Sequence, residues 1–400
     1  MKTYLFFCIA VSVLSWLLFC MRRKPSTRMA SVDAVVPAYN EAPCLEHTLE
    51  ALLRNSYINK VICVNDGSTD STPSILDRMK IQWQDKLIVV HQKNTGKGGA
   101  LMSGIARVST QWVFLTDADT YVPPNSNGLG YMLAELERGA DAVGGIPSSY
   151  LKGAGLLPHI RATVKLPMIV LKRTFQQIVG GAPFIISGAC GMFRREIFNK
   201  CQFSDRTRVE DLDLTWTLIS RGYRVRQSSR CVVYPQECNT LRDEWKRWRR
   251  WIVGYAVCMR LHKSLLFTRF GIFSIFPMFL VVIVGTIAYT TVWGRAAFDL
   301  GLMGIIMAVF PLLWVSIVMI IGVFSAWYHQ RWVLIFLAPL SVFYVLLAYI
   351  IWSIYGFIAF FSGSEPERDK PTRYLQVVEY TRKNTSSISP SGNAFVSENK

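Results

Sequence analysis

The chain has 400 residues, 51% of them hydrophobic, and a formal net charge of +17 at pH 7. This apolar content predicts membrane segments joined to a soluble part, and the positive charge then favours contact with anionic lipid over nucleic-acid binding. The nine cysteines show no CxxC or zinc-finger spacing, which excludes a zinc site of that kind and leaves them as reduced packing residues.

An apolar run lies near the start of the sequence. Tyr4–Cys20 carries no charge and, at about 17 residues, is just long enough to span a bilayer. Only Lys2 precedes it, and we expect residues 1–21 to be an uncleaved N-terminal transmembrane helix with the next domain in the cytoplasm; the alternative is a signal peptide. This orientation rests on the basic residues that follow the run: Arg22, Arg23, Lys24 and Arg28.

Residues 31–240 have the pattern of a cytoplasmic α/β domain. Short apolar runs alternate with amphipathic segments, which is typical of parallel βαβ units whose functional loops follow the strands. The expected strands are 32–36, 61–64, 87–91 and 112–115, and the expected helices are 42–55, 71–79 and 100–108.

Two carboxylates follow the fourth of these strands. Asp117 and Asp119 are separated by one residue, so they should lie on the same side at the carboxyl end of the strand. Ligands gather at this end of open α/β sheets, and two oxygen ligands suit a divalent cation that also holds a diphosphate. A strand that simply ends in a polar turn would give the same pattern.

The loops after the second and third strands carry two further candidates. Asp66 would accept a hydrogen bond from a base or a ribose; the alternative is an Asx turn with Asp70 or Ser71 as the helix N-cap. Lys97 lies in a glycine-rich loop at a helix N-terminus, which favours phosphate, although a glycine turn with a solvated lysine explains the pattern equally well.

Four motifs in this order resemble the nucleotide-binding half of the family 2 glycosyltransferases with a GT-A (Rossmann-like) fold: Val36–Glu41, Val64–Asp70, Asn94–Leu101 and Thr116–Asp119. The resemblance implies Mg²⁺ or Mn²⁺ held by Asp119 and Asp117. It also implies a UDP-sugar donor bound by Pro37, Tyr39, Glu41, Asp66, Lys97 and Asp117.

The second half extends the resemblance to the membrane-embedded members of that family. Two segments match their acceptor-side loop and their Glu-Asp motif: Ile186–Arg195 and Val209–Trp216. The resemblance implies acceptor contacts from Ser187 and Gly188. It also implies that Asp211, with Glu210 beside it, is the general base that takes the proton of the acceptor hydroxyl. A helix N-terminus carrying several acids would look the same.

Residues 241–270 are basic and aromatic. On a helix over 242–255 three tryptophans spaced three apart form one stripe beside arginines, which predicts an interfacial helix with indoles at headgroup level. The segment also occupies the place of the family's Gln-x-x-Arg-Trp motif. The resemblance implies that Arg250 contacts the donor diphosphate and that Trp251 stacks on the acceptor sugar, but Arg247 stands where Gln is expected.

Residues 271–361 predict a C-terminal transmembrane region. Gly271–Trp293 and Leu300–Trp327 are each long enough to span a bilayer. Val333–Phe361 either crosses once or forms an interfacial or re-entrant piece followed by a shorter one. The polar residues 362–400 follow, and we expect the end of this tail to be disordered.

The combined pattern most resembles bacterial poly-N-acetylglucosamine synthases, which are related to hyaluronan, chitin-oligosaccharide and cellulose synthases. The resemblance implies an inverting, multi-pass enzyme of the bacterial inner (plasma) membrane that polymerises UDP-N-acetylglucosamine into a β-linked biofilm exopolysaccharide and exports it. The implied partners are the growing glycan, membrane lipids and a small partner membrane protein. The alternatives are another UDP-sugar, transfer of one sugar to a lipid-linked acceptor, and a catalytically inactive membrane scaffold.

Overall fold

The computed structural model describes residues 24–277 and 298–363, together with residues 291, 295, 372 and 374. The expected N-terminal span, most of Gly271–Trp293 and the end of the polar tail lie outside the described residues.

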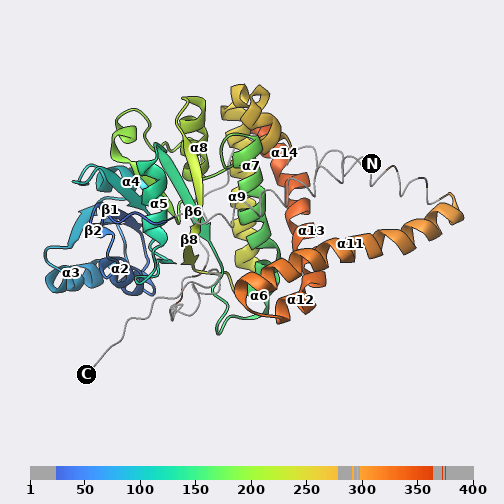
Figure 1. Cartoon of the computed structure of the whole chain (residues 1–400), viewed down its shortest axis with the longest axis horizontal. Helices are drawn as coiled ribbons and strands as arrows, with labels where there is room; N and C mark the ends of the chain where they lie inside the picture. Colours follow the sequence, from blue (N-terminus) through green and yellow to red (C-terminus); the bar gives the residue numbers. More distant parts are fainter. Residues whose placement is uncertain are drawn as a thin grey trace.

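The N-terminal half folds into the predicted parallel βαβ units (Figure 1). β1 (Val32–Ala38) lies between β2 (Ile58–Asp66) and β4 (Trp112–Leu115), and β2 also pairs with β3 (Leu87–Gln92); all three pairings are parallel. The connecting helices are α2 (Leu45–Leu53), α3 (Thr72–Gln82) and α4 (Gly96–Ile105). Each strand and helix predicted here is confirmed, with shifted ends for all except 112–115.

These strands are mostly apolar because both faces of the sheet are covered. Along β1, Val32, Ala34 and Val36 pack into one hydrophobic core, and Val35 packs into the core on the other face. The sheet is therefore a largely apolar buried layer, and a polar side chain inside it, such as Asp33 of β1, is hydrogen-bonded, here to Ser109 and Thr110.

The second half continues the same sheet with mixed directions. β7 (Gly191–Arg194) is antiparallel to β4 and to β6 (Ala142–Pro147), β8 (Val225–Pro235) is parallel to β6, and β5 (Thr120–Tyr121) is antiparallel to β8. The resulting strand order is β3-β2-β1-β4-β7-β6-β8-β5. Helices α5 (Gly128–Glu137) and α8 (Glu210–Ser220) belong to this half.

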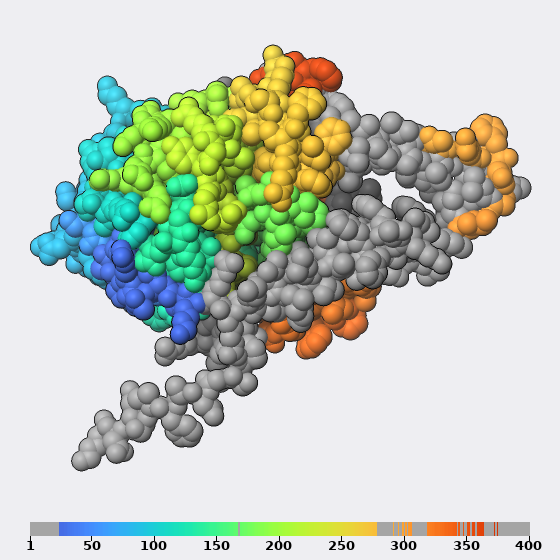
Figure 2. Space-filling model, turned by 45° about the horizontal axis from the view of Figure 1, so that its top comes forward, coloured from blue at the N-terminus to red at the C-terminus, as the bar shows by residue number. Residues whose placement is uncertain are grey.

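Further helices pack beside the α/β domain, as Figures 1 and 2 show from two directions. Within the described part of the chain, none of the helices has the combined length and hydrophobicity of a membrane span. The bounds are α6 (Leu156–Pro167), a π-helix (Met168–Lys172), α7 (Arg173–Val179), α9 (Leu241–Leu261), α11 (Leu300–His329), α12 (Val333–Leu337), α13 (Ser341–Ile351) and α14 (Phe357–Ser362).

The predicted Trp/Arg helix is α9, and its tryptophans pack on aromatic side chains of the C-terminal helices. Trp245 meets the ring of Tyr355 edge-on with centroids 6.2 Å apart. Trp248 lies against Tyr344, and its Nε1–H donates a hydrogen bond of 2.7 Å to the Tyr344 hydroxyl. These contacts fix α9 between the sheet domain and α13.

Candidate active site

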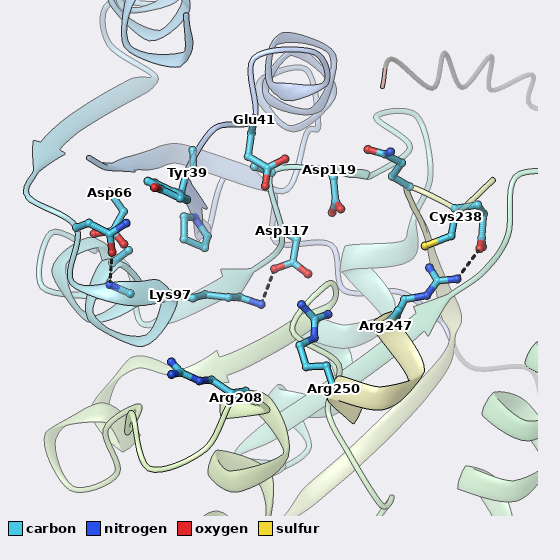
Figure 3. Close-up of a pocket in the computed structure, with 18 residues that line it drawn as sticks. Tyr39, Glu41, Asp66, Lys97, Asp117, Asp119, Arg208, Cys238, Arg247 and Arg250 are labelled. Carbon is cyan, nitrogen blue, oxygen red and sulfur yellow. Dashed lines mark hydrogen bonds and ion pairs between the residues drawn. The ribbon is translucent and has the colours of Figure 1, made fainter. Parts of the chain in front are cut away.

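A cavity of about 380 Å³ is lined by the loops at the carboxyl ends of β1, β2 and β4, by the segment after β8 and by α9 (Figure 3). It collects every residue that the sequence predicts for the nucleotide sugar and the metal: Pro37, Tyr39, Glu41, Asp66, Lys97, Asp117, Asp119 and Arg250. The carboxyl ends of parallel strands meet at one edge of a sheet, which explains why segments far apart in sequence converge here.

Asp66 is buried and holds the turn that opens α4. Its Oδ1 accepts hydrogen bonds from the Thr95 backbone N–H (2.8 Å), the Thr95 hydroxyl (3.2 Å) and the Gln92 amide (2.8 Å). The N-cap of α3 is Ser71, which makes no side-chain capping hydrogen bond, and the preceding Asp70 accepts a hydrogen bond from the Thr72 N–H at 3.0 Å through its Oδ1. The predicted Asx turn is therefore present, and the role of Asp66 towards a ligand stays a prediction.

Lys97 joins the two halves of the site. Its Nζ lies 2.7 Å from Oδ1 of Asp117 and 2.9 Å from Oε1 of Glu210, and its side chain is only 18% exposed. Gly96 precedes it with a φ of +81°, a conformation that glycine adopts without strain. The alternative of a solvated lysine is wrong, because Lys97 connects the metal-motif carboxylate to the first turn of α8.

Asp211, the predicted base, is partly buried in the first turn of α8. Its Oδ2 accepts a hydrogen bond of 2.9 Å from the backbone N–H of Gly188, and Ser187 lies in the same turn. Desolvation, and then the neighbouring Glu210, raise the pKa of Asp211 above its usual range, while Lys97 acts in the opposite direction. A carboxylate with a raised pKa is a stronger base at neutral pH, as proton removal requires.

Two groups near Asp211 were missed by the sequence reasoning. Burial lowers the pKa of Arg173, although the Asp211 carboxylate acts against this, and burial together with Asp211 raises the pKa of Tyr255. Nη1 of Arg173 is buried and has no hydrogen-bond partner within the described part of the chain. No sequence signal separates Arg173 from the other basic residues.

The cavity wall also contains Arg208, Gln236, Glu237 and Cys238, which no motif indicated. The last three directly follow β8, so a predicted strand there would have marked them as loop residues at a sheet edge. Arg208 precedes α8 and carries no such signal.

Arg247 lines the cavity together with Arg250, one turn further along α9. It pairs closely with Glu244, and its guanidinium lies 5.5 Å from the centre of the Trp251 ring. The guanidinium of Arg161 lies 5.9 Å from the same ring. Trp251 is not among the described residues that line the cavity, and the same holds for Ser187, Gly188, Glu210 and Asp211. The stacking of Trp251 on an acceptor sugar stays a prediction.

The carboxylates of the cavity fit a divalent cation that is held partly by the protein and partly by a bound ligand. Asp117 and Asp119 both line the cavity, and the described residues contain no group of three or more His, Cys, Asp or Glu side chains that would hold a metal by themselves. Mg²⁺ is usually bound by one or two carboxylates plus substrate phosphates and water. The two aspartates therefore match a cation that a diphosphate helps to hold.

The domain is a mixed α/β fold of GT-A type, with acidic and basic side chains around a cavity at the carboxyl edge of the sheet. This is the architecture of a glycosyltransferase, and the comparisons with known proteins agree. The family model described as "Glycosyl transferase family 2" matches residues 33–202. The uncharacterized glycosyltransferase YaiP of Escherichia coli (strain K12) is 65% identical over 379 residues, covering 95% of both chains. The chain belongs to glycosyl transferase family 2 and is an enzyme of that family.

More distant similarities are also informative. The poly-beta-1,6-N-acetyl-D-glucosamine synthase of Staphylococcus aureus (strain COL) is 29% identical over 245 residues, which cover 59% of this chain and 58% of that protein. The structure of a mannosyltransferase, PcManGT from Pyrobaculum calidifontis in complex with GDP-Man and Mn²⁺, matches with a TM-score of 0.55 and 19% identity. That match covers 83% of this chain and 94% of the mannosyltransferase, and it shows a shared fold.

Proposed function

We propose that this enzyme transfers a sugar from a nucleoside diphosphate sugar to an acceptor hydroxyl with inversion at the anomeric carbon. The observation that carries the proposal is Lys97, which places Asp117 and Glu210 within 3 Å of a single ammonium group. The carboxylate of the metal motif and the acidic turn that holds Asp211 are therefore parts of one site.

The chain's own residues account for the steps of this reaction. Lys97 and Arg250 bind the diphosphate, and both point towards Asp117 in Figure 3. The acceptor hydroxyl attacks the anomeric carbon, the bond to the diphosphate breaks, and Asp211 takes the hydroxyl proton. Attack from the face opposite the leaving group gives a β-linkage from an α-donor. The Gly188 N–H keeps the Asp211 carboxylate in place during this transfer.

Asp117 and Asp119 would hold Mg²⁺ or Mn²⁺, which supplies positive charge that offsets the developing charge on the leaving diphosphate. A divalent cation and a sugar nucleotide are both named for the mannosyltransferase that shares the fold.

For the donor and product we propose UDP-N-acetylglucosamine and a β-linked polysaccharide that is exported. The ordered motifs and the similarity to the Staphylococcus synthase support this choice. The apolar runs and the basic residues after Cys20 support a bacterial inner-membrane location with the catalytic domain in the cytoplasm, in contact with membrane lipids. For the small partner membrane protein, the support is the resemblance to poly-N-acetylglucosamine synthases alone.

A second candidate is the transfer of a single sugar to a lipid-linked acceptor. Arg247 favours it, because an arginine replaces the expected Gln and lines the cavity. The size of the product separates the two candidates: a polymer supports the synthase, and a lipid-extractable product with one added sugar supports the second.

The test of the base is Asp211→Asn in the full-length protein with radiolabelled UDP-sugar. We expect unchanged binding of the UDP-sugar and a loss of transfer of about 10²–10⁴-fold, the usual contribution of a positioned base. Glu196→Gln, at an exposed acid, is the matched control and should transfer at the wild-type rate. Transfer by the Asp211 variant at the wild-type rate would contradict the assignment.

A further inference from the structure

Five charged side chains form a nearly dry cluster between α6, the segment after β8 and α9. Glu237 accepts contacts from Arg161, from Lys165 (2.7 Å) and from Arg247 (3.8 Å). Glu244 pairs with Arg247 and lies 3.6 Å from Nε of Arg161. None of the five side chains is more than 11% exposed.

The charges in this cluster do not balance. Within the described part of the chain, three cations face two carboxylates, and an uncompensated buried charge is costly. Burial and the nearby Arg161 lower the pKa of Lys165 to about 8 even though Glu237 acts in the opposite direction. Counted over the residues that the structure describes, the cluster is therefore short of one negative charge.

The cluster reaches the cavity through two of its members. Glu237 and Arg247 both line it, and Figure 3 shows Arg247 at the end opposite Asp66. Among the described residues, Nε of the buried Arg247 has no hydrogen-bond partner, so the guanidinium retains donor capacity despite its carboxylate neighbours. The charge deficit of the cluster and the unpaired Nε of Arg247 therefore both belong to the residues at this end of the cavity.

The other side of the cluster faces the apolar C-terminal helices. Tyr344 of α13 donates a hydrogen bond to Glu244 and accepts one from Trp248, so α13 is tied directly to the cluster. Nearby on α12 and α13, Phe336 is 80% exposed and Phe343 is 70% exposed. A ligand that combines an anionic group with an apolar tail would match both features.

We propose that Arg247, backed by Arg161 and Lys165, forms a subsite for the phosphate of a phosphate-ester acceptor. The inference rests on the second candidate under the proposed function, transfer of a single sugar to a lipid-linked acceptor, because it names the acceptor class of the same site. Arginine suits this task because its planar guanidinium binds phosphate oxygens in pairs. The phosphate is bound and does not react: the attacking group is still the acceptor hydroxyl, its proton goes to Asp211, and the nucleoside diphosphate leaves.

The test uses matched acceptors with the full chain in mixed micelles: dioleoylphosphatidylglycerol, dioleoylglycerol and the water-soluble glycerol 3-phosphate. The readout is the ratio of kcat/KM for acceptors with and without phosphate. We expect a ratio of at least about tenfold in the wild type, since hydrogen bonds to charged groups are strong. A higher kcat/KM for dioleoylphosphatidylglycerol than for glycerol 3-phosphate identifies a lipid headgroup as the acceptor. Equal kcat/KM values for these two acceptors identify a free phosphate ester. A ratio near one between the acceptors with and without phosphate overturns the proposal.

Variants at Arg247 complete the test. Arg247→Gln should reduce the ratio at least about tenfold, and Arg247→Lys should restore part of it. The single variant leaves the Glu244 carboxylate without this partner and could fold poorly for that reason. The double variant Arg247→Gln/Glu244→Gln removes that carboxylate as well, and it should show the same reduction of the ratio. Arg249→Gln removes a charge from the same helix outside the cavity lining and should keep the wild-type ratio. A wild-type ratio in both Arg247→Gln variants would overturn the proposal.

The two proposals fail in different ways. Failure of the proposed function appears as the absence of nucleoside diphosphate release with every UDP-sugar and acceptor. Failure of the phosphate subsite appears as turnover that is indifferent to the phosphate of the acceptor.

Discussion

Lys97→Met is the most informative single change in this site. The ammonium group joins Asp117 to Glu210, and its charge acts to lower the pKa of the neighbouring Asp211. Methionine keeps most of the volume and removes the charge. The pKa of Asp211, already raised by desolvation and by Glu210, should therefore rise further.

The size of this effect follows from the geometry. Lys97 is only 18% exposed, so water screens its charge poorly, but that charge is shared between Asp117 and Glu210. We therefore expect an effect at the low end of what the loss of an opposite charge beside a carboxyl causes. A base must be deprotonated to act, so the acid limb of the pH–rate profile should move to higher pH, and the rate below the limb should fall about tenfold.

The assay is the pH dependence of kcat/KM for transfer, which reports the groups of the free enzyme. Under the proposed mechanism the limb reports Asp211 together with the neighbouring carboxyl of Glu210, so its displacement is the quantity to compare. Weaker diphosphate binding in Lys97→Met would lower kcat/KM at every pH without moving the limb. Lys93→Met, at an exposed lysine that precedes the same helix, is the control. An acid limb at the wild-type pH in Lys97→Met would refute the electrostatic account.

Two further variants test the metal site and the packing. Asp119→Asn should raise the Mn²⁺ concentration for half-maximal activity by at least about tenfold, because even the loss of a residue that only hydrogen-bonds to a metal ligand has an effect of that size. The control is Asp85→Asn, at an exposed aspartate. An unchanged Mn²⁺ requirement in Asp119→Asn would exclude Asp119 as a ligand. A Cβ on the buried Gly130 would lie 2.4 Å from Oη of Tyr57, so Gly130→Ala should lower the free energy of unfolding by about 1–3 kcal/mol in a urea titration. Gly155→Ala, where a Cβ meets no atom within 4 Å, should leave it unchanged, and equal stability of both variants would contradict the packing argument.

The part of the site that follows from the sequence is the part that depends on local pattern and simple topology. The apolar run Trp112–Leu115 is bounded by polar residues on both sides, and it is strand β4 with the predicted ends. Once parallel βαβ units are inferred, the rule that loops meet at the carboxyl ends of strands places Asp66 and Asp119 in one cavity without further information.

The partners of these residues could not be predicted in the same way. Glu237 is assigned no role by any motif, and its cations come from α6 and α9, far apart in the sequence. The antiparallel insertion of β7 between β4 and β6 determines which segments meet there, and no periodicity in the sequence encodes that order. Trp251 was assigned by its place in a motif, whereas its surroundings depend on how α9 packs.

Lys97 shows most clearly where the sequence argument stops. The glycine-rich loop indicated phosphate binding, and nothing in it pointed to α8, which begins more than a hundred residues later. In the fold, the same ammonium group touches one carboxylate from each motif and acts to lower the pKa of Asp211, the proposed base. In the proposed reaction, donor binding and proton removal therefore depend on each other. Any diphosphate that draws Lys97 towards itself also changes the electrostatic environment of Asp211.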